Sequence, residues 1–194
     1  WESVYEPLIR AAAGLGQLDK APDPSTYDKG FLHCDLLIIG AGPAGLISAL
    51  EAAKTGLKVI ICDEDFLPGG RLTSDEERIE GYSSVAWVKN ILSELQRFNN
   101  VRLMCRTTVY GAFDHGIFGA LERKTDHLAT DEGKPRQLLW KVYSKRSLLC
   151  SGALERGISF GNNDRPGILL SSALRSYAVR WAIRPGERIA IFTN

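Results

Sequence analysis

The sequence predicts an α/β fold with a mainly parallel sheet, and three observations support this prediction. Two short runs rich in β-branched and aliphatic residues, 35–39 and 58–62, flank a segment of good helix formers at 46–55. This order is typical of a strand–helix–strand unit. A glycine-rich turn joins the first run to the helix, and Gly56 follows the helix as a stop signal. Finally, the hydrophobic content of 44% and the charged content of 24% are ordinary for a globular protein.

The turn between residues 39 and 46 carries the strongest functional signal in the chain. It reads, in order, Gly40, Ala41, Gly42, Pro43, Ala44 and Gly45. Gly40 permits the tight turn, Gly42 lets a pyrophosphate approach the backbone, and Gly45 lets the helix pack closely on the sheet. The helix N-terminus then offers free N–H groups and a partial positive charge to phosphates. We interpret these six residues as the turn of a dinucleotide-binding, Rossmann-like unit.

An acidic residue completes this unit. Asp63 lies 23 residues after Gly40, at the carboxyl end of the second predicted strand. A carboxylate there accepts hydrogen bonds from both hydroxyls of an adenosine ribose and repels a 2′-phosphate. The pattern therefore favours NAD or FAD over NADP. Glu64 is the alternative ribose ligand, or else a solvated charge at the strand end.

A second glycine cluster follows at residues 68–72. Gly69 and Gly70 are positioned to bring backbone N–H groups to the same pyrophosphate, and Arg71 and Leu72 complete the predicted contact. The alternative is a plain turn. We interpret the acidic stretch 75–80 as a solvated loop rather than a metal site.

The remaining polar residues predict neither a metal site nor a catalytic group. The three histidines and four cysteines lack metal-ligand spacing, and no Cys-x-x-Cys pair occurs. We expect single buried thiols in a reducing, cytoplasmic compartment. Lys+Arg 24 against Asp+Glu 23 gives a net charge of +1, which argues against a nucleic-acid partner. No apolar run approaches the length of a membrane span.

Periodicity predicts the other elements and a division into three parts. We expect an amphipathic helix at 84–98 capped by Ser83 or Ser84, a third strand at 101–105, and a β-meander at 107–144 that turns at 114–116. A short run at 147–150 returns to the sheet. The predicted parts are an N-terminal arm (1–30) with a helix beginning at Pro7, a dinucleotide-binding domain (31–160), and a linker helix (171–181) with a first strand (188–192) of a truncated second domain (161–194).

Several segments resemble the alpha subunits of heterotetrameric sarcosine oxidase, within the wider family of flavoproteins with two dinucleotide-binding domains. The segments are WESVYEPLIRAAAGLG, HCDLLIIGAGPAGL, ICDEDFLPGGRL, RTTVYGAFDH, LERKTDHL, RQLLWKVYSKR, GALERGISFGNNDRPGI and GERIAIFTN. Cys150-Ser151-Gly152 stands where the family usually has Ala-Thr-Gly. We expect cofactor contacts to survive at Ser151 and Gly152, and a further one at Val109.

The resemblance implies a cofactor-holding role within a complex. The alpha fold would hold NAD, or FAD in the alternative, with FMN and FAD elsewhere in the complex. Beta, gamma and delta subunits would be partners, and a C-terminal domain not present in this chain would bind tetrahydrofolate. Sarcosine would become glycine and hydrogen peroxide. We identify no catalytic residue in the chain.

Three alternatives remain open at this point. The first is the FAD-binding subunit of a related amine, proline or opine dehydrogenase. The second is a disulfide-reductase-like flavoenzyme, which the lack of a redox cysteine pair disfavours. The third is a scaffold whose dinucleotide site is only structural.

Overall fold

A computed structural model describes residues 1–14, 20–130 and 133–192. Its centre is a six-stranded sheet in the order β5-β2-β1-β8-β7-β6, in which the first four strands run parallel and the last three form an antiparallel meander. The strands and helices of this body are β1 (Tyr27–Ile39), α2 (Pro43–Lys54), β2 (Val59–Cys62), α3 (Ser84–Leu95), β5 (Val101–Met104), β6 (Thr107–Phe113), β7 (Ile117–Arg123) and β8 (Gln137–Leu149). The prediction of a Rossmann-like α/β fold with an inserted meander is confirmed.

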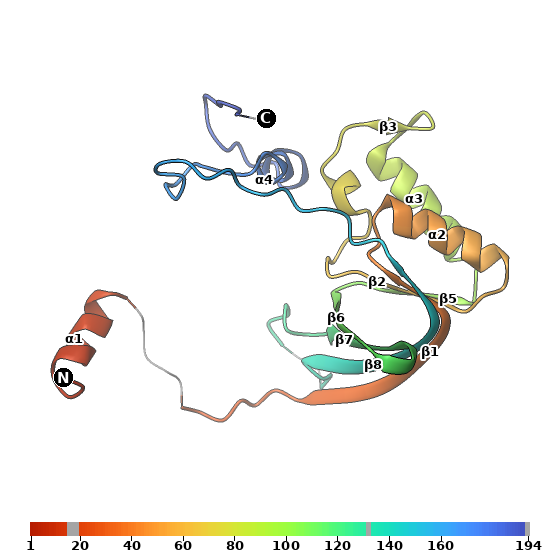
Figure 1. Cartoon of the computed structure of the whole chain (residues 1–194), viewed down its shortest axis with the longest axis horizontal. Helices are drawn as coiled ribbons and strands as arrows, with labels where there is room; N and C mark the ends of the chain where they lie inside the picture. The colour runs from red at the N-terminus through yellow and green to blue at the C-terminus, as the bar shows by residue number, and fades with distance from the viewer. Residues whose placement is uncertain (15–19, 131–132, 193–194) are drawn as a thin grey trace.

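The sheet buries apolar side chains on both faces. On one face, Ile38 and Ile61 pack against α2 and α3 through Leu46 and Val88. On the other face, a second core cluster forms where the curved sheet brings the meander over the parallel strands (Figure 1). Its buried members are Cys34, Leu37, Ile60, Cys62, Met104, Phe118, Ala120 and Val142.

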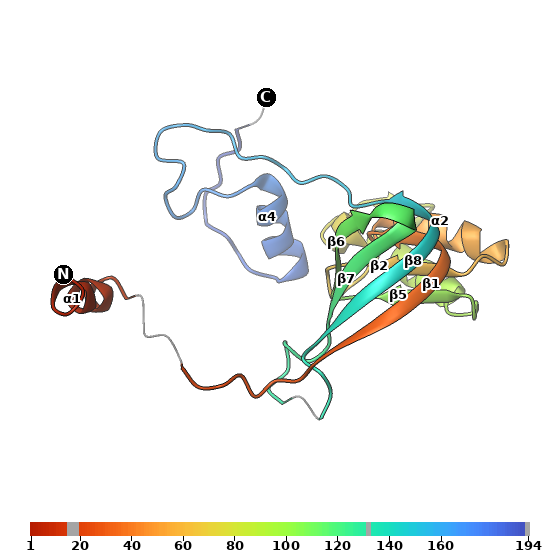
Figure 2. The ribbon, with the colours of Figure 1, turned by 60° about the horizontal axis from the view of Figure 1, so that its bottom comes forward.

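Strand β1 is longer than the predicted run 35–39, and this is a correction. It begins at Tyr27, so its first residues lie inside the predicted arm. The reason is its partner strand. The meander strand and the run at 147–150, which were predicted separately, form the single long strand β8, and β8 pairs with β1 from Tyr27↔Gln137 to Ile39↔Leu149 (Figure 2). Near Asp35 the N–H groups of Asp35 and Leu36 both donate to the Lys58 carbonyl, and the side-chain alternation of β1 is interrupted: Cys34 and Leu37 belong to one core cluster and Leu36 and Ile38 to the other. This interruption hid the full length of the strand from the sequence pattern.

Several local predictions are confirmed. The predicted helix 84–98 is α3, and Ser83 caps it by accepting a hydrogen bond from the Ala86 N–H at 3.3 Å. The turn at 114–116 places His115 at φ 61° and Gly116 at φ 71°. The predicted helix 171–181 is α4 (Ser171–Arg175), continued by the π-helical turn η3 (Ser176–Arg180).

The two ends of the described chain differ in secondary structure: the N-terminal end contains a helix, and the C-terminal end contains no regular element. The predicted N-terminal helix is α1 (Tyr5–Ala12), which begins two residues before the predicted start at Pro7. It stands apart from the sheet in both views (Figures 1 and 2). The predicted strand 188–192 is wrong: these residues adopt no regular structure, because no strand within residues 20–130 and 133–192 lies beside them to pair with. Smaller elements are η1 (Gly70–Thr73), β3 (Arg78–Ile79), β4 (Tyr82–Ser83) and η2 (Asp114–Gly116).

All four cysteines are free thiols; Cys34 and Cys62 are buried as predicted, whereas Cys105 and Cys150 are only partly buried. Burial raises the pKa of the Cys62 thiol to about 12, so this sulfur stays protonated and unreactive at neutral pH. Among the described helices, none combines the length and apolar character needed to cross a bilayer.

Candidate functional site

The predicted site residues converge at the carboxyl ends of β1, β2 and β8. Three backbone hydrogen bonds of 2.8 Å hold the converging segments together: Gly40 N–H to Cys62 O, Gly69 N–H to Ala41 O, and Cys150 N–H to Ile39 O. The first glycine turn, the acid, the second glycine cluster and the 150–152 segment therefore meet at one edge of the sheet. This edge is where open α/β sheets bind nucleotides.

The three glycines of the first turn have three different environments. Gly40 has φ +105°, and a Cβ there would lie 2.3 Å from the Cys150 carbonyl oxygen. A Cβ on Gly45 would lie 1.9 Å from the Gly40 oxygen. A Cβ on Gly42 would meet no atom within 4 Å. Gly40 and Gly45 are therefore required by packing within the chain, whereas Gly42 faces open space.

The start of α2 matches an anion site. Gly42 is its N-cap, and Pro43 occupies the first turn, where its missing N–H costs nothing. The N–H groups of Ala44 and Gly45 belong to the first turn, which has no intrahelical acceptors. Ala44 is exposed and no side chain covers Gly42. These residues fit a dinucleotide pyrophosphate.

The second glycine cluster packs directly on the first. A Cβ on Gly70 would lie 3.0 Å from the Gly42 Cα. Gly69 and Gly70 have φ +125° and +54°, a region that favours glycine. The Leu72 side chain is buried in the core, so only its backbone faces this edge. The Arg71 Nε donates to the Asp75 carboxylate at 2.9 Å.

Asp75 corrects the prediction of a solvated acidic loop. Its side chain is only 3% exposed, and its two carboxylate oxygens pair with Arg71 Nε and Arg175 Nη1, each at 2.9 Å. The pattern of acidic residues did not reveal this, because Arg175 belongs to α4, far along the chain.

Asp63 ties the site together. Its Oδ2 accepts a hydrogen bond from the Ala41 N–H at 2.6 Å, and its Oδ1 accepts one from the Asp65 N–H at 2.8 Å. Each carboxylate oxygen has a second lone pair, so the group retains acceptor capacity for ribose hydroxyls. Glu64 is exposed, and its backbone carbonyl, rather than its side chain, accepts from Arg123 Nη2 at 2.6 Å. This geometry favours Asp63 as the oriented carboxylate.

Next to Asp63 lies an open pocket of about 470 Å³ that sequence reasoning missed. Its lining residues are Glu64, Asp65, Thr108 and Arg123. Arg180 of η3 makes a bidentate pair with Asp65 at 2.6 and 2.8 Å, and this guanidinium lowers the pKa of Asp65. No spacing rule in the sequence connects residue 65 with residue 180.

The other predicted contacts lie around this edge at different depths. Ser151 and Gly152 are exposed and follow Cys150, whose carbonyl covers Gly40. Val109 packs against the second core cluster, two residues beyond Thr107, whose N–H donates to the Asp63 carbonyl. Within the described residues, no group of His, Cys, Asp or Glu side chains is arranged to hold a metal ion.

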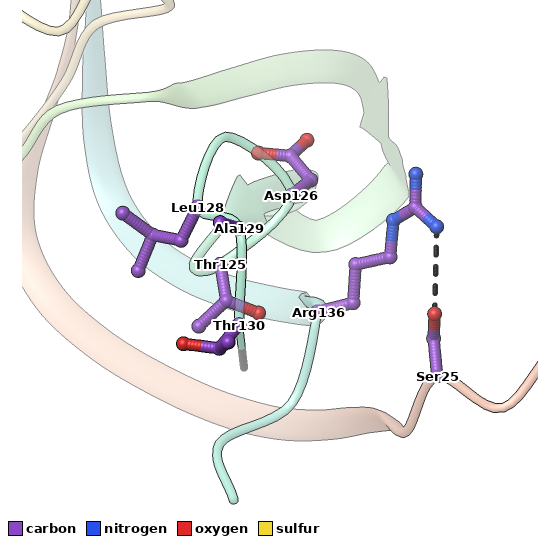
Figure 3. Close-up of a pocket in the computed structure, with 7 residues that line it drawn as sticks. All are labelled: Ser25, Thr125, Asp126, Leu128, Ala129, Thr130 and Arg136. Carbon is purple, nitrogen blue, oxygen red and sulfur yellow. Dashed lines mark hydrogen bonds between the residues drawn. The ribbon is translucent and has the colours of Figure 1, made fainter. Parts of the chain in front are cut away.

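A second hollow, of about 280 Å³, contains none of the predicted site residues. Its lining residues are Ser25, Thr125, Asp126, Leu128, Ala129, Thr130 and Arg136 (Figure 3). Arg136 Nη1 donates to the Ser25 hydroxyl across it at 3.4 Å. It lies before the start of β1 and β8, at the opposite end of these strands from the glycine turns.

The fold and the site define the class of protein. Residues 35–121 match a family model described as FAD dependent oxidoreductase. Among solved structures, L-proline dehydrogenase from P. horikoshii matches with a TM-score of 0.66 and 25% identity, over 88% of this chain and 32% of that chain. A thioredoxin reductase from T. acidophilum matches with a TM-score of 0.50 and 16% identity, over 68% of this chain and 40% of that chain, which shows the fold alone. The chain therefore has a Rossmann-like α/β fold that resembles those of FAD-dependent oxidoreductases.

Two curated relatives identify a narrower group within this class. The sarcosine oxidase alpha chain of Rhizobium meliloti (strain 1021) is 44% identical over 195 residues, which is 100% of this chain and 20% of that protein. The corresponding protein of Corynebacterium sp. (strain U-96) is 40% identical, over 94% of this chain and 19% of that protein. The chain is thus a homologue of sarcosine oxidase alpha subunits along its whole length and spans about a fifth of theirs. The resemblance found in the sequence is confirmed.

Gly42→Val should abolish dinucleotide binding in a folded protein. The added side chain enters open space that the pyrophosphate needs, and the φ of −70° and ψ of −177° at Gly42 suit valine. We expect affinity to fall by about a hundredfold or more, or roughly 3 kcal/mol, by titration calorimetry on the full-length subunit. Gly161→Val is the matched control, because Gly161 also faces open space. Unchanged binding by Gly42→Val would refute the pyrophosphate assignment.

Asp63→Ala should weaken NAD binding by roughly ten- to a hundredfold, because a charge-assisted hydrogen bond contributes about 1.5–3 kcal/mol. Glu64→Ala is the control and should bind normally. Asp63→Ala also removes the hydrogen bond from the Ala41 N–H. Melting temperatures without NAD measure the stability lost with this bond, and the rise in melting temperature on adding NAD measures the affinity. If Glu64→Ala loses affinity and Asp63→Ala does not, the wrong carboxylate has been assigned.

Proposed function

We propose that this chain is the dinucleotide-binding part of the alpha subunit of a sarcosine oxidase complex. The observation that carries the proposal is identity of 44% along the entire chain to a sarcosine oxidase alpha subunit, combined with an intact glycine turn whose Gly42 is open to a ligand. The overall reaction is the oxidative demethylation of sarcosine with tetrahydrofolate and oxygen. Its products are glycine, methylene-tetrahydrofolate and hydrogen peroxide.

In the proposed complex, this chain binds and does not react. The α2 N-terminus and Gly42 hold the pyrophosphate, and Asp63 holds the adenosine ribose. Gly70 contacts the pyrophosphate from the adjoining turn, whereas the Gly69 N–H, which was also predicted to contact it, instead donates to the Ala41 carbonyl. Flavins elsewhere in the complex, FMN and FAD, supply the redox chemistry on sarcosine. Beta, gamma and delta subunits are the proposed partners, and tetrahydrofolate binds outside this chain. The dinucleotide-binding domain, predicted as 31–160, is proposed to begin with β1 at Tyr27, so the arm that precedes it is shorter than the predicted 1–30; residues 161–194 follow.

NAD is the proposed occupant of the site, and FAD is the competing one. Asp63 suits either molecule, because both carry an adenosine ribose with free hydroxyls. The glycine turns likewise suit either molecule, because both carry a pyrophosphate. The family model that matches residues 35–121 is named for FAD, which favours the competitor.

Release of the bound dinucleotide from the full-length alpha subunit decides between them. We expect a colourless nucleotide that alcohol dehydrogenase reduces to NADH, and a protein that lacks flavin absorbance in the visible range. The Gly42→Val variant, purified in parallel, should release no nucleotide. A yellow extract with the flavin spectrum would replace NAD by FAD while leaving the binding site as described.

The second candidate function is oxidation of a different secondary amine, and two observations favour it. An opine oxidase chain of Agrobacterium tumefaciens (strain Ach5) is 29% identical over 72% of this chain and covers 28% of its own length in the match. The L-proline dehydrogenase structure superimposes over 88% of the chain.

Peroxide release by the assembled complex tests the substrate. The complex should release about one hydrogen peroxide per sarcosine consumed, with at least tenfold lower kcat/KM for proline and for opines. Formation of methylene-tetrahydrofolate should require added tetrahydrofolate. Turnover of proline or an opine without turnover of sarcosine would move the protein to the second function.

A further inference from the structure

The N-terminal helix α1 presents an apolar face that contacts nothing in the described chain. The apolar residues follow the helical spacing of one, three and four: Trp1, Val4, Tyr5, Leu8 and Ile9. Each of these side chains is more than half exposed, and no residue of α1 is buried. Trp1 stacks on Tyr5 with ring centroids 6.1 Å apart. A helix of this length with such a face is stable only when the face is covered.

The sheet presents a second uncovered apolar face. Phe31 lies beside Lys141 in the pairing of β1 with β8, and Lys141 lies beside Gly119 in the pairing with β7. The Tyr110 ring covers Gly119, so Tyr110 shares this side of the sheet. The exposed apolar residues of this sheet face are Tyr27, Phe31, Tyr110, Phe113 and Leu139.

This sheet face continues the one that α2 and α3 cover. Leu36 and Ile38 pack under the two helices, whereas Cys34 and Leu37 belong to the opposite core cluster. Leu32 also packs on that opposite cluster, so Phe31, its neighbour in the alternating strand, points to the same side as Leu36. Near the glycine turns the helix layer is therefore complete, and over the first half of β1 it is missing. In α/β folds, helices fill this layer.

The charges and the chain length match α1 to this gap. Glu2 and Glu6 flank the apolar face of α1, and Glu6 pairs with Arg10. Lys29 and Lys141 stand on the sheet face, with Lys141 Nζ 6.0 Å from the Phe31 ring. Residues 13–26 connect α1 to β1, and an extended chain of that length spans about 45–50 Å. Arg10 is the single basic residue among residues 1–14. Helices that bind anionic membranes carry several Lys or Arg residues, so a membrane is disfavoured as the surface that covers α1.

We propose that α1 docks on the outer face of β1, β8 and β7 in the same chain. It completes the helix layer beside α2 and α3, with Leu8 and Ile9 against Phe31 and Tyr110. The inference does not depend on the proposed function, because it uses none of the dinucleotide site residues.

Hydroxyl-radical footprinting of the full-length protein tests this contact through the oxidation rates of Phe31 and Tyr110. The double variant Leu8→Asp and Ile9→Asp should raise both rates several-fold over the parent. The double variant Ser3→Asp and Arg10→Gln lowers the net charge by the same two units on the polar side of this N-terminal segment, and it should leave both rates unchanged. In the reciprocal experiment, Phe31→Asp should increase the oxidation of Trp1.

Three outcomes would overturn the proposal. Equal oxidation of Phe31 in the parent and in the Leu8→Asp, Ile9→Asp variant means that α1 does not cover it. If the oxidation rate of Trp1 is the same in the Phe31→Asp variant as in the parent, α1 likewise does not lie on this sheet face. Light scattering on the same samples distinguishes the chains involved, because protection that appears only in a dimer places α1 on a second copy instead.

Discussion

The site depends on the parallel pairing of β1 with β8 in a single register. From Tyr27↔Gln137 to Ile39↔Leu149 this register holds along the strands, so Cys150 arrives directly beside Gly40. The Cys150 carbonyl then occupies the space where a Gly40 Cβ would stand, 2.3 Å away. A slip of one residue would reverse the faces of β8 and move this carbonyl off the turn. Pairing along the strands thus fixes the shape of the turn at their end.

The loop after β2 uses three carboxylates for three different contacts. Asp63 binds the backbone of the glycine turn, Asp65 binds Arg180, and Asp75 binds Arg71 and Arg175. The guanidinium of Arg180 lowers the pKa of Asp65, so this pair persists at acidic pH where an ordinary aspartate would protonate. A bidentate pair has the geometry that offsets the desolvation of both charges. One loop therefore supports the glycine turns at the edge of the sheet and holds the segment 171–180 against it.

The described contacts suit the binding role proposed for this chain. Gly42 is left open, Asp63 is oriented by backbone N–H groups, and the buried thiol of Cys62 is kept protonated by its surroundings. In the proposed complex, the chemistry on the amine lies on other parts of the assembly. In the proposed docking, the apolar face of α1 packs on the apolar sheet face over the first half of β1, so each face covers the other.

The sequence by itself determined the elements whose signals are local. The glycine spacing at 40–45 with an acid after the next strand predicted the turn and the position of Asp63 beside it, because both follow from one short strand–helix–strand unit. The cap at Ser83 and the turn at His115 and Gly116 were also readable from neighbouring residues. Contacts that join distant residues were decided only by the tertiary structure. The length of β1 depends on β8, the burial of Asp75 depends on Arg175, and the chain from 188 to 192 lacks a strand because strands require a partner.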